Sequence, residues 1–256
     1  MTSNNYITVA SVALCLAVSS AIAADGPKPA KLFLLGGQSN MKGQGVARQL
    51  QGQYATPPAN VKLWCNGQWG PLAADARGTF GPEIAFGHAI SKATPDEVIY
   101  LVKYAVGGTA LYNDWAPTNG PQYKGFMATA ESALADLAQS KTEYTFEAML
   151  WLQGESDAAE NRGALYEENL TQFIAHMRSK FNAPEMPFII ARVRSFYGGK
   201  TGQAKLVRDA QVKIAESSDT IAWFDTDDCA LLNQGHYNST GLFTVGERFA
   251  KAYQQF

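Results

Sequence analysis

The chain has 256 residues, which is enough for one large α/β domain. Apolar residues make up 46% and charged residues 17% of the chain, so a globular fold with a sizeable core is expected rather than a disordered chain. The formal net charge is −2, and lysine and arginine form no long cluster. Both observations argue against nucleic acid or an anionic membrane as a partner.

Residues 1–23 have the pattern of a cleavable secretory signal. They carry no charged side chain, and their apolar stretch at 6–18 is too short to span a bilayer. The segment ends in Ala21-Ile22-Ala23, a small-x-small pattern typical of signal cleavage sites. We therefore expect a secreted or periplasmic protein without a membrane anchor, with a single domain at 24–256.

Removal of this segment leaves two cysteines, Cys65 and Cys229. Two cysteines in an exported protein can pair, but the sequence does not give the distance and orientation that a disulfide requires. The pairing is therefore left open, with a structural role if it forms.

Short apolar runs alternate with segments of helical periodicity along the rest of the chain. The expected strands are 31–35, 61–64, 98–106, 146–152, 188–193 and 221–224. One helix is expected to begin at Pro82. Four further helices are expected at 127–140, 165–181, 205–216 and, near the C-terminus, 242–253. This alternation predicts a parallel sheet that is covered by helices on both faces.

Three of these strands end in clusters of glycine and polar residues. The clusters are Gln38-Ser39-Asn40, Gly107-Gly108-Thr109 and Gln153-Gly154-Glu155-Ser156-Asp157. Because the carboxyl ends of parallel strands meet at one edge of a sheet, we expect these clusters to converge. Taken alone, Ser39 is better explained as the cap of the next helix, and only this convergence favours a chemical role.

His236 is the histidine best placed to join the clusters. It lies in the loop Asn233–Asn238 between the last strand and the last helix, at the same edge. His88 and His176 fall within predicted helices and are better explained by packing. A serine, a histidine and a carboxylate at one edge are the groups that nucleophilic acyl transfer needs, because the histidine takes the serine proton and the acid orients the ring.

Five blocks of the sequence resemble the motif blocks of the SGNH hydrolase superfamily. They are GQSNM at 37–41, FGPE at 80–83, KYAVGGT at 103–109, WLQGESD at 151–157 and the His236 loop. They are most similar to the carbohydrate esterase family 6 and sialate O-acetylesterase-like branch, over about residues 31–253. The resemblance implies the SGNH hydrolase fold, a flavodoxin-like three-layer α/β/α sandwich with a central parallel sheet. It also implies removal of O-acetyl groups from an acetylated carbohydrate substrate without a metal or other cofactor.

The resemblance assigns roles to individual positions. Ser39 matches the nucleophile and His236 matches the general base. Gly108 matches the glycine whose backbone N–H joins that of Ser39 in the oxyanion hole. The third donor of the wider superfamily is an asparagine amide in the third block, and Gln153 is the residue predicted to replace it here.

The third member of the triad departs from the family pattern. Many relatives carry aspartate three residues before the histidine, where this chain has Asn233. Asparagine holds a ring by hydrogen bonding but cannot offset the charge of an imidazolium. Either the triad is weakened or another carboxylate serves, and Glu155 is the predicted one, ahead of the less favourable Asp157, Asp227 and Asp228. A purely structural role for Glu155 is the alternative.

Trp115, in a loop rich in proline, asparagine and glycine, is the predicted substrate-binding aromatic, with ordinary packing as the alternative. No cluster of residues has metal-ligand spacing, so no metal is expected. Two other functions stay open: a general SGNH esterase or thioesterase acting on small acyl esters or lipids, and a non-catalytic carbohydrate-binding relative. The GQSN and QGE blocks favour the carbohydrate branch, and the presence of Ser39 and His236 argues against loss of catalysis.

Overall fold

The computed structural model describes residue 1 and residues 28–196 and 201–256. Apart from Met1, the predicted signal segment lies outside the described residues. Within the described ranges, no helix combines the length and the apolar character needed to cross a membrane.

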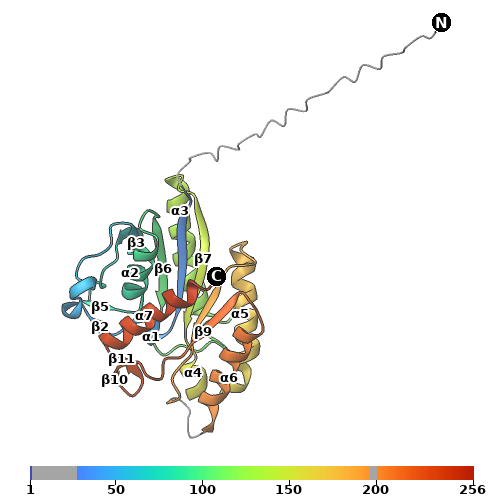
Figure 1. The fold of residues 1–256 in the computed structure, drawn as a ribbon. Coiled ribbons are helices and arrows are strands. Elements are labelled where there is room, and N and C mark those ends of the chain that lie inside the picture. Colours follow the sequence, from blue (N-terminus) through green and yellow to red (C-terminus); the bar gives the residue numbers. More distant parts are fainter. Residues whose placement is uncertain (2–27, 197–200) are drawn as a thin grey trace.

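Seven of the strands form one sheet at the centre of the molecule (Figure 1). The strands are β1 (Ala30–Gly37), β2 (Gly45–Val46), β3 (Val61–Cys65), β4 (Gln68–Pro71), β5 (Thr79–Phe80), β6 (Ile99–Ala105), β7 (Tyr144–Leu152), β8 (Phe188–Ala191), β9 (Ile221–Phe224), β10 (Leu231–Asn233) and β11 (His236–Tyr237). The sheet order is β4-β3-β6-β1-β7-β8-β9, and every neighbouring pair is parallel except β3 and β4. The strand that precedes Ser39, β1, therefore lies at the centre of the sheet.

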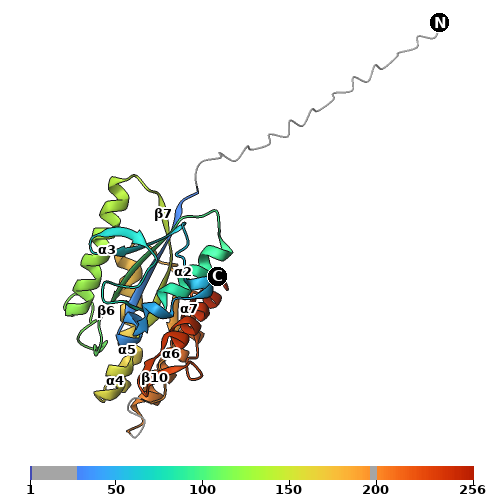
Figure 2. The ribbon, with the colours of Figure 1, turned by 90° about the vertical axis from the view of Figure 1, so that its left-hand side faces the viewer.

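Helices cover both faces of this sheet. They are α1 (Ser39–Lys42), α2 (Glu83–Ala93), α3 (Pro121–Gln139), α4 (Glu155–Ala159), α5 (Tyr166–Lys180), α6 (Gln203–Glu216) and α7 (Ser239–Tyr253). Figure 2 shows the sheet edge-on, with α3 and α5 on one side and α2 and α7 on the other. The predicted three-layer α/β/α sandwich with a mainly parallel sheet is confirmed.

The alternation of side chains along β1 explains the three layers. Leu32 and Leu34 pack into the hydrophobic cluster that includes residues of α3, α5 and α6. Phe33 and Leu35 belong to the opposite cluster, which includes residues of α2 and α7. A continuous apolar run is therefore needed in this strand, because both of its faces are buried.

Two of the differences from the sequence-based prediction concern β4 and the start of α3. The turn at Asn66 and Gly67, with φ of 52° and 76°, joins β3 to an antiparallel edge strand, β4, in a region predicted mainly as loop. Helix α3 begins at Pro121, six positions before the predicted start at 127, with proline in its first turn. Its early residues Tyr123 and Phe126 continue the buried face that begins the predicted range at Met127, and proline is favoured at a helix start.

Candidate active site

The end of β1 forms a turn that only glycine accommodates. Gly37 has a φ of +151°, and a Cβ on this residue would lie 2.1 Å from the carbonyl oxygen of Leu152. The chain then enters the four-residue helix α1, whose first residue is Ser39. No side chain caps α1 by a hydrogen bond, so the helix-cap explanation of Ser39 does not describe its hydroxyl.

The Ser39 hydroxyl faces His236 across the carboxyl edge of the sheet. Ser39 Oγ lies 3.1 Å from His236 Nε2, which is hydrogen-bonding distance. His236 begins β11, the second strand of the short antiparallel hairpin β10–β11. These residues are 197 positions apart in the chain, and the fold brings them together as predicted.

The other ring nitrogen of His236 contacts the neutral side chain of Asn233. His236 Nδ1 lies 3.1 Å from Asn233 Oδ1. Partial burial of the ring lowers the pKa of His236, because removal from water disfavours the charged imidazolium. At neutral pH the ring is therefore neutral, with a lone pair available to accept a proton.

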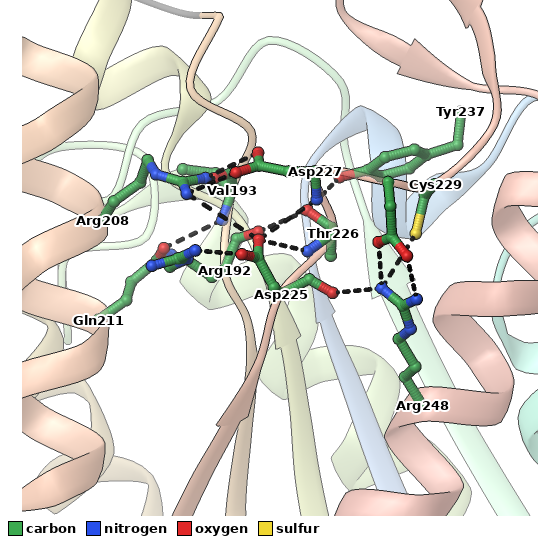
Figure 3. Close-up of polar contacts among 11 residues, drawn as sticks. Arg192, Val193, Arg208, Gln211, Asp225, Thr226, Asp227, Cys229, Tyr237 and Arg248 are labelled. Atoms are coloured by element: carbon green, nitrogen blue, oxygen red, sulfur yellow. Dashed lines mark hydrogen bonds and ion pairs between the residues drawn. The ribbon is translucent and has the colours of Figure 1, made fainter.

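Two arginines hold the segment that leads from β9 to this hairpin (Figure 3). Arg208 on α6 pairs with Asp227 at 2.7 Å, and Arg248 on α7 pairs with Asp228 at 2.6 Å. Arg248 also donates to the carbonyl oxygen of Asp225 at 2.7 Å. Asp227 and Asp228 are thus engaged by arginines, and neither is the hydrogen-bond partner of the histidine.

The residue after His236 is anchored to the same segment. Tyr237 Oη donates to Thr226 Oγ1 at 2.7 Å, and Thr226 Oγ1 donates to the carbonyl oxygen of Arg192 at 2.6 Å (Figure 3). Tyr237 is almost completely buried, at 1% exposure. The hairpin is therefore linked through Thr226 to Arg192, the residue that follows β8.

The position of Glu155 corrects the predicted triad. Its Oε1 accepts a hydrogen bond from Asn40 Nδ2 at 2.8 Å, and its Oε2 is buried without a partner among the described residues. The carboxylate makes no hydrogen bond to His236, whose Nδ1 is occupied by Asn233. Glu155 starts α4, where its side chain meets the residue after the serine instead of the imidazole.

Gln153 is also not placed as predicted. Its Nε2 donates to Asp157 Oδ2 at 2.6 Å and to the carbonyl oxygen of Thr109 at 3.0 Å, and the side chain is fully buried. An amide nitrogen has two hydrogens, and both are used inside the protein. Gln153 therefore has no donor left for an oxyanion.

Gly108 remains in a suitable place beside Ser39. The adjacent Gly107 is so close that a Cβ on it would lie 3.4 Å from Ser39 Cβ. Gly108 has a φ of +71°, a left-handed conformation that favours glycine. Within the described ranges, the backbone N–H groups of Ser39 and Gly108 donate no hydrogen bond, so both are available to an incoming oxygen.

Trp115 is a core residue and does not face solvent. Its side chain is 0% exposed and packs edge-on against Trp151, with ring centroids 5.1 Å apart. Its Nε1 donates to Thr109 Oγ1 at 3.0 Å. The predicted substrate contact is wrong, because the loop folds inward and its tryptophan fills the layer between the sheet and α3.

Comparison with known proteins identifies the family. Residues 29–255 match the family described as carbohydrate esterase, sialic acid-specific acetylesterase. The chain belongs to this family. A probable carbohydrate esterase of Arabidopsis thaliana is 28% identical over 249 residues, covering 88% of this chain and 90% of that protein. The chain is thus a carbohydrate esterase by family, as its motif blocks predicted.

Solved structures support the same fold. An Arabidopsis thaliana protein superposes with a TM-score of 0.74 at 24% identity, covering 89% of this chain and 98% of that one. NanS gives a TM-score of 0.70 at 15% identity, covering 90% of this chain and 98% of that one. A carbohydrate acetylesterase from Xanthomonas citri gives 0.66 at 18% identity, covering 87% of this chain and 55% of that one.

A cavity of about 450 Å³ opens beside the Ser39 turn of this carbohydrate esterase. Its lining includes Lys42, Trp64, Tyr104 and Ala105. It does not include Ser39 or His236. Lys42 ends the helix that Ser39 begins, and Ala105 pairs with Gly37 in the sheet. The cavity therefore adjoins the site on the β6 side and offers both aromatic surface and polar groups.

Asn40 is a site residue for which the sequence predicted no role, although it lies in the GQSN block. The structure buries its side chain to 3% exposure and places it between Glu155 and the histidine hairpin. The sequence signal that could have indicated a role is a polar residue directly after the serine, at the carboxyl end of a buried strand. Within the described ranges, no group of three or more histidine, cysteine, aspartate or glutamate residues is arranged to hold a metal ion.

Proposed function

We propose that this carbohydrate esterase is a serine esterase that removes O-acetyl groups from carbohydrate. The observation that carries the proposal is the 3.1 Å contact between Ser39 Oγ and His236 Nε2. A neutral imidazole at hydrogen-bonding distance is the group that activates a serine hydroxyl for attack on an ester. Asn233 serves as the residue that orients the ring, since within residues 28–196 and 201–256 no carboxylate is hydrogen-bonded to His236.

The first half of the reaction transfers the acetyl group to the enzyme. His236 Nε2 takes the hydroxyl proton as Ser39 Oγ bonds to the acetyl carbonyl carbon. The carbonyl oxygen becomes an oxyanion, which the N–H groups of Ser39 and Gly108 stabilise as donors. The intermediate then breaks its bond to the sugar oxygen, which receives the proton from His236 and leaves as a free hydroxyl.

The second half returns the enzyme to its starting state. A water molecule gives a proton to His236 Nε2 and bonds to the carbonyl carbon of the acetyl group on Ser39. The resulting oxyanion uses the same two N–H donors. Its collapse breaks the bond to Ser39 Oγ, which regains the proton from His236, and acetate leaves. No step requires a metal or a cofactor.

The cavity beside α1 supports a carbohydrate as the leaving group. The partly buried Tyr104 contributes to its lining, and an aromatic ring can pack against the apolar face of a sugar. The polar lining residues Lys42 and Asn66 supply donors and acceptors for hydroxyl groups. Acetylated xylan and acetylated sialic acid are the substrate types that we propose for it.

We also retain the proposal that the protein is exported as a single domain. Its support is the uncharged segment at 1–23 with the Ala21-Ile22-Ala23 ending. N-terminal sequencing of the protein recovered from the periplasm or medium tests this proposal. Recovery of an uncleaved chain from the cytoplasm alone would overturn it.

Acetate release from a substrate panel tests the function. The panel holds acetylated xylo-oligosaccharides, acetylated sialosides, a short-chain lipid ester and an acyl thioester. We expect acetate from the carbohydrates, and a loss on the order of 10⁴ in turnover for Ser39→Ala. A folded Ser39→Ala protein with normal turnover would exclude the serine mechanism, and activity confined to the lipid ester or thioester would exclude the carbohydrate substrate.

A further inference from the structure

The side chain of Asn40 connects the serine turn to the backbone on both sides of the histidine. Asn40 Nδ2 donates to the carbonyl oxygen of Gly235 at 3.0 Å, and Asn40 Oδ1 accepts from the backbone N–H of Tyr237 at 3.3 Å. Gly235 and Tyr237 are the residues immediately before and after His236. One amide group therefore holds the short stretch of chain that carries the imidazole.

Glu155 completes this arrangement from the opposite side. The second hydrogen of Asn40 Nδ2 is donated to Glu155 Oε1 at 2.8 Å. Since Gly235 requires a donor and Tyr237 requires an acceptor, the orientation of the Asn40 amide is fixed by backbone groups. Glu155 is thus the side-chain acceptor that holds Asn40 in the position where it reaches both backbone groups.

The burial of Glu155 makes its hydrogen bond with Asn40 important for stability. The residue is 1% exposed, and a carboxyl group is costly to bury unless a hydrogen bond compensates. Burial raises the pKa of Glu155, so its charged form is disfavoured in this position. Asn40 is the side chain that hydrogen-bonds this carboxyl group.

We infer that Glu155 is a positioning residue that acts through Asn40 to keep the imidazole of His236 against the Ser39 hydroxyl. It does not touch the ring and does not share its charge. This inference rests on the proposed function, because it describes how the same serine and histidine are held at reacting distance. In this arrangement the histidine is positioned by two hydrogen-bonded side chains, Glu155 and Asn40, and not by a carboxylate in contact with the ring.

A neighbouring carboxylate on α4 provides a contrast. Asp157 Oδ2 accepts from the backbone N–H of Leu111 at 2.8 Å, and Asp157 Oδ1 accepts from that of Tyr112 at 3.2 Å. These contacts hold the loop after Gly108 and do not reach the histidine hairpin. The two acidic residues of the short helix α4 therefore fix opposite sides of the serine, Glu155 the histidine side and Asp157 the glycine side.

The test compares two substitutions of Glu155. Glu155→Gln keeps an oxygen that accepts from Asn40 and removes the charge, so we expect kcat within about fivefold of wild type. Glu155→Leu removes the acceptor, so we expect kcat to fall about a hundredfold with KM nearly unchanged. A triad acid would show the opposite result for Gln, a loss on the order of 10⁴. A purely structural residue would lower thermal stability and leave the kcat of the folded enzyme unchanged.

A double-mutant cycle tests whether Glu155 acts through Asn40. Asn40→Ala should lower kcat about as much as Glu155→Leu, and the double variant should lose no more than either one. If Glu155→Leu does not fold, Asn40→Ala and Glu155→Gln still decide the question. Additive losses, or a normal kcat in folded Asn40→Ala, would overturn the inference. Glu160→Gln is the control, because this exposed carboxylate directly after α4 accepts a hydrogen bond from Tyr112 Oη at 3.0 Å and has no contact with Asn40 or the histidine hairpin among the described residues.

A measurement without substrate separates this inference from the proposed function. NMR of ¹⁵N-labelled histidine follows the three imidazoles of the chain. In wild type and Glu155→Gln, the Nδ1 proton of His236 should exchange slowly, and in Asn40→Ala and Glu155→Leu it should broaden. If the wild type releases no acetate but the signal still depends on Asn40, the function fails and the positioning stands. An unchanged His236 signal in both variants would overturn the positioning.

Discussion

Asn233 presents its side-chain oxygen to the Nδ1 atom of His236. The backbone N–H groups of Gly235 and His236 each donate to the same Asn233 Oδ1 at 3.0 Å, and His236 Nδ1 lies 3.1 Å from it. Because a backbone N–H only donates, these two bonds determine which end of the amide faces the ring. Nδ1 then carries the proton, and Nε2 turns its lone pair toward Ser39. An asparagine in this place selects the required tautomer without supplying a charge.

The pH dependence of activity should reflect the neutral surroundings of His236. Partial burial lowers the pKa of His236, and Asn233 adds no charge to raise it again. The base must be unprotonated, so activity falls as pH decreases through this pKa. We expect kcat/KM to reach half its maximum below the ordinary histidine value of about 6.5. A pH–rate profile on a soluble acetyl ester measures this, and a midpoint well above 7 would show that a carboxylate contacts the ring.

Trp115 should contribute to stability and not to substrate binding. Its side chain is 0% exposed and contacts Trp151 in the core. Trp115→Ala should lower the free energy of unfolding by about 3–5 kcal/mol, as measured by urea denaturation. Trp115→Phe should fold and keep KM for an acetylated oligosaccharide within about twofold of wild type. A folded Trp115→Phe enzyme whose KM rises tenfold would restore the predicted substrate contact.

The two cysteines of the described chain should behave as independent thiols. Cys65 is exposed, Cys229 is buried, and neither forms a disulfide. Burial raises the pKa of Cys229 to about 11, so its reactive thiolate is scarce at neutral pH. Iodoacetamide at pH 8 should therefore modify Cys65 quickly and Cys229 only after unfolding, as peptide mass mapping would show. A melting temperature that drops on adding a reductant would indicate a disulfide instead.

Much of the fold could be predicted because its signals are local. The apolar run before Gly36-Gly37 requires a strand with two buried faces, and the turn after it requires glycine at position 37. The edge strand β4 was missed because Gln68 to Pro71 lie on the rim of the sheet, where no residue is fully buried and burial does not alternate along the strand. At such edge positions packing does not restrict the residue types, so the sequence does not indicate a strand.

For the site, strand ends predicted which residues converge but not where their side chains point. Ser39 and His236 follow structural boundaries, so topology alone brought them to one edge. Glu155 and Gln153 reach the same edge, but their directions depend on buried partners that are distant in sequence. The direction of Trp115 likewise depends on a hydrogen bond and a ring contact inside the core.

The substitution Asn233→Asp should convert the orienting amide into a charged group. The aspartate side chain keeps an oxygen for the N–H groups of Gly235 and His236, so the hairpin should retain its shape. The added negative charge stabilises the imidazolium and raises the pKa of His236. Because position 233 is exposed, solvent weakens this effect, and we expect the acid limb of the pH–rate profile to move up by about one pH unit. Above that limb, kcat should rise about tenfold, because the transition state carries the same imidazolium.

Asn238→Asp is the matched control for this substitution. Asn238 lies in the same segment, but its Oδ1 accepts from the backbone N–H of Gly241 at 2.9 Å and caps α7, away from the ring. Aspartate is an equally good cap and adds the same charge away from Nδ1, and it removes the hydrogen bond from Asn238 Nδ2 to the carbonyl oxygen of Leu231 at 3.2 Å. Steady-state pH profiles of the wild type and both variants decide the matter. If Asn233→Asp shifts neither the acid limb nor kcat, or if Asn238→Asp shifts both equally, the oxygen at position 233 does not govern the charge of the imidazole.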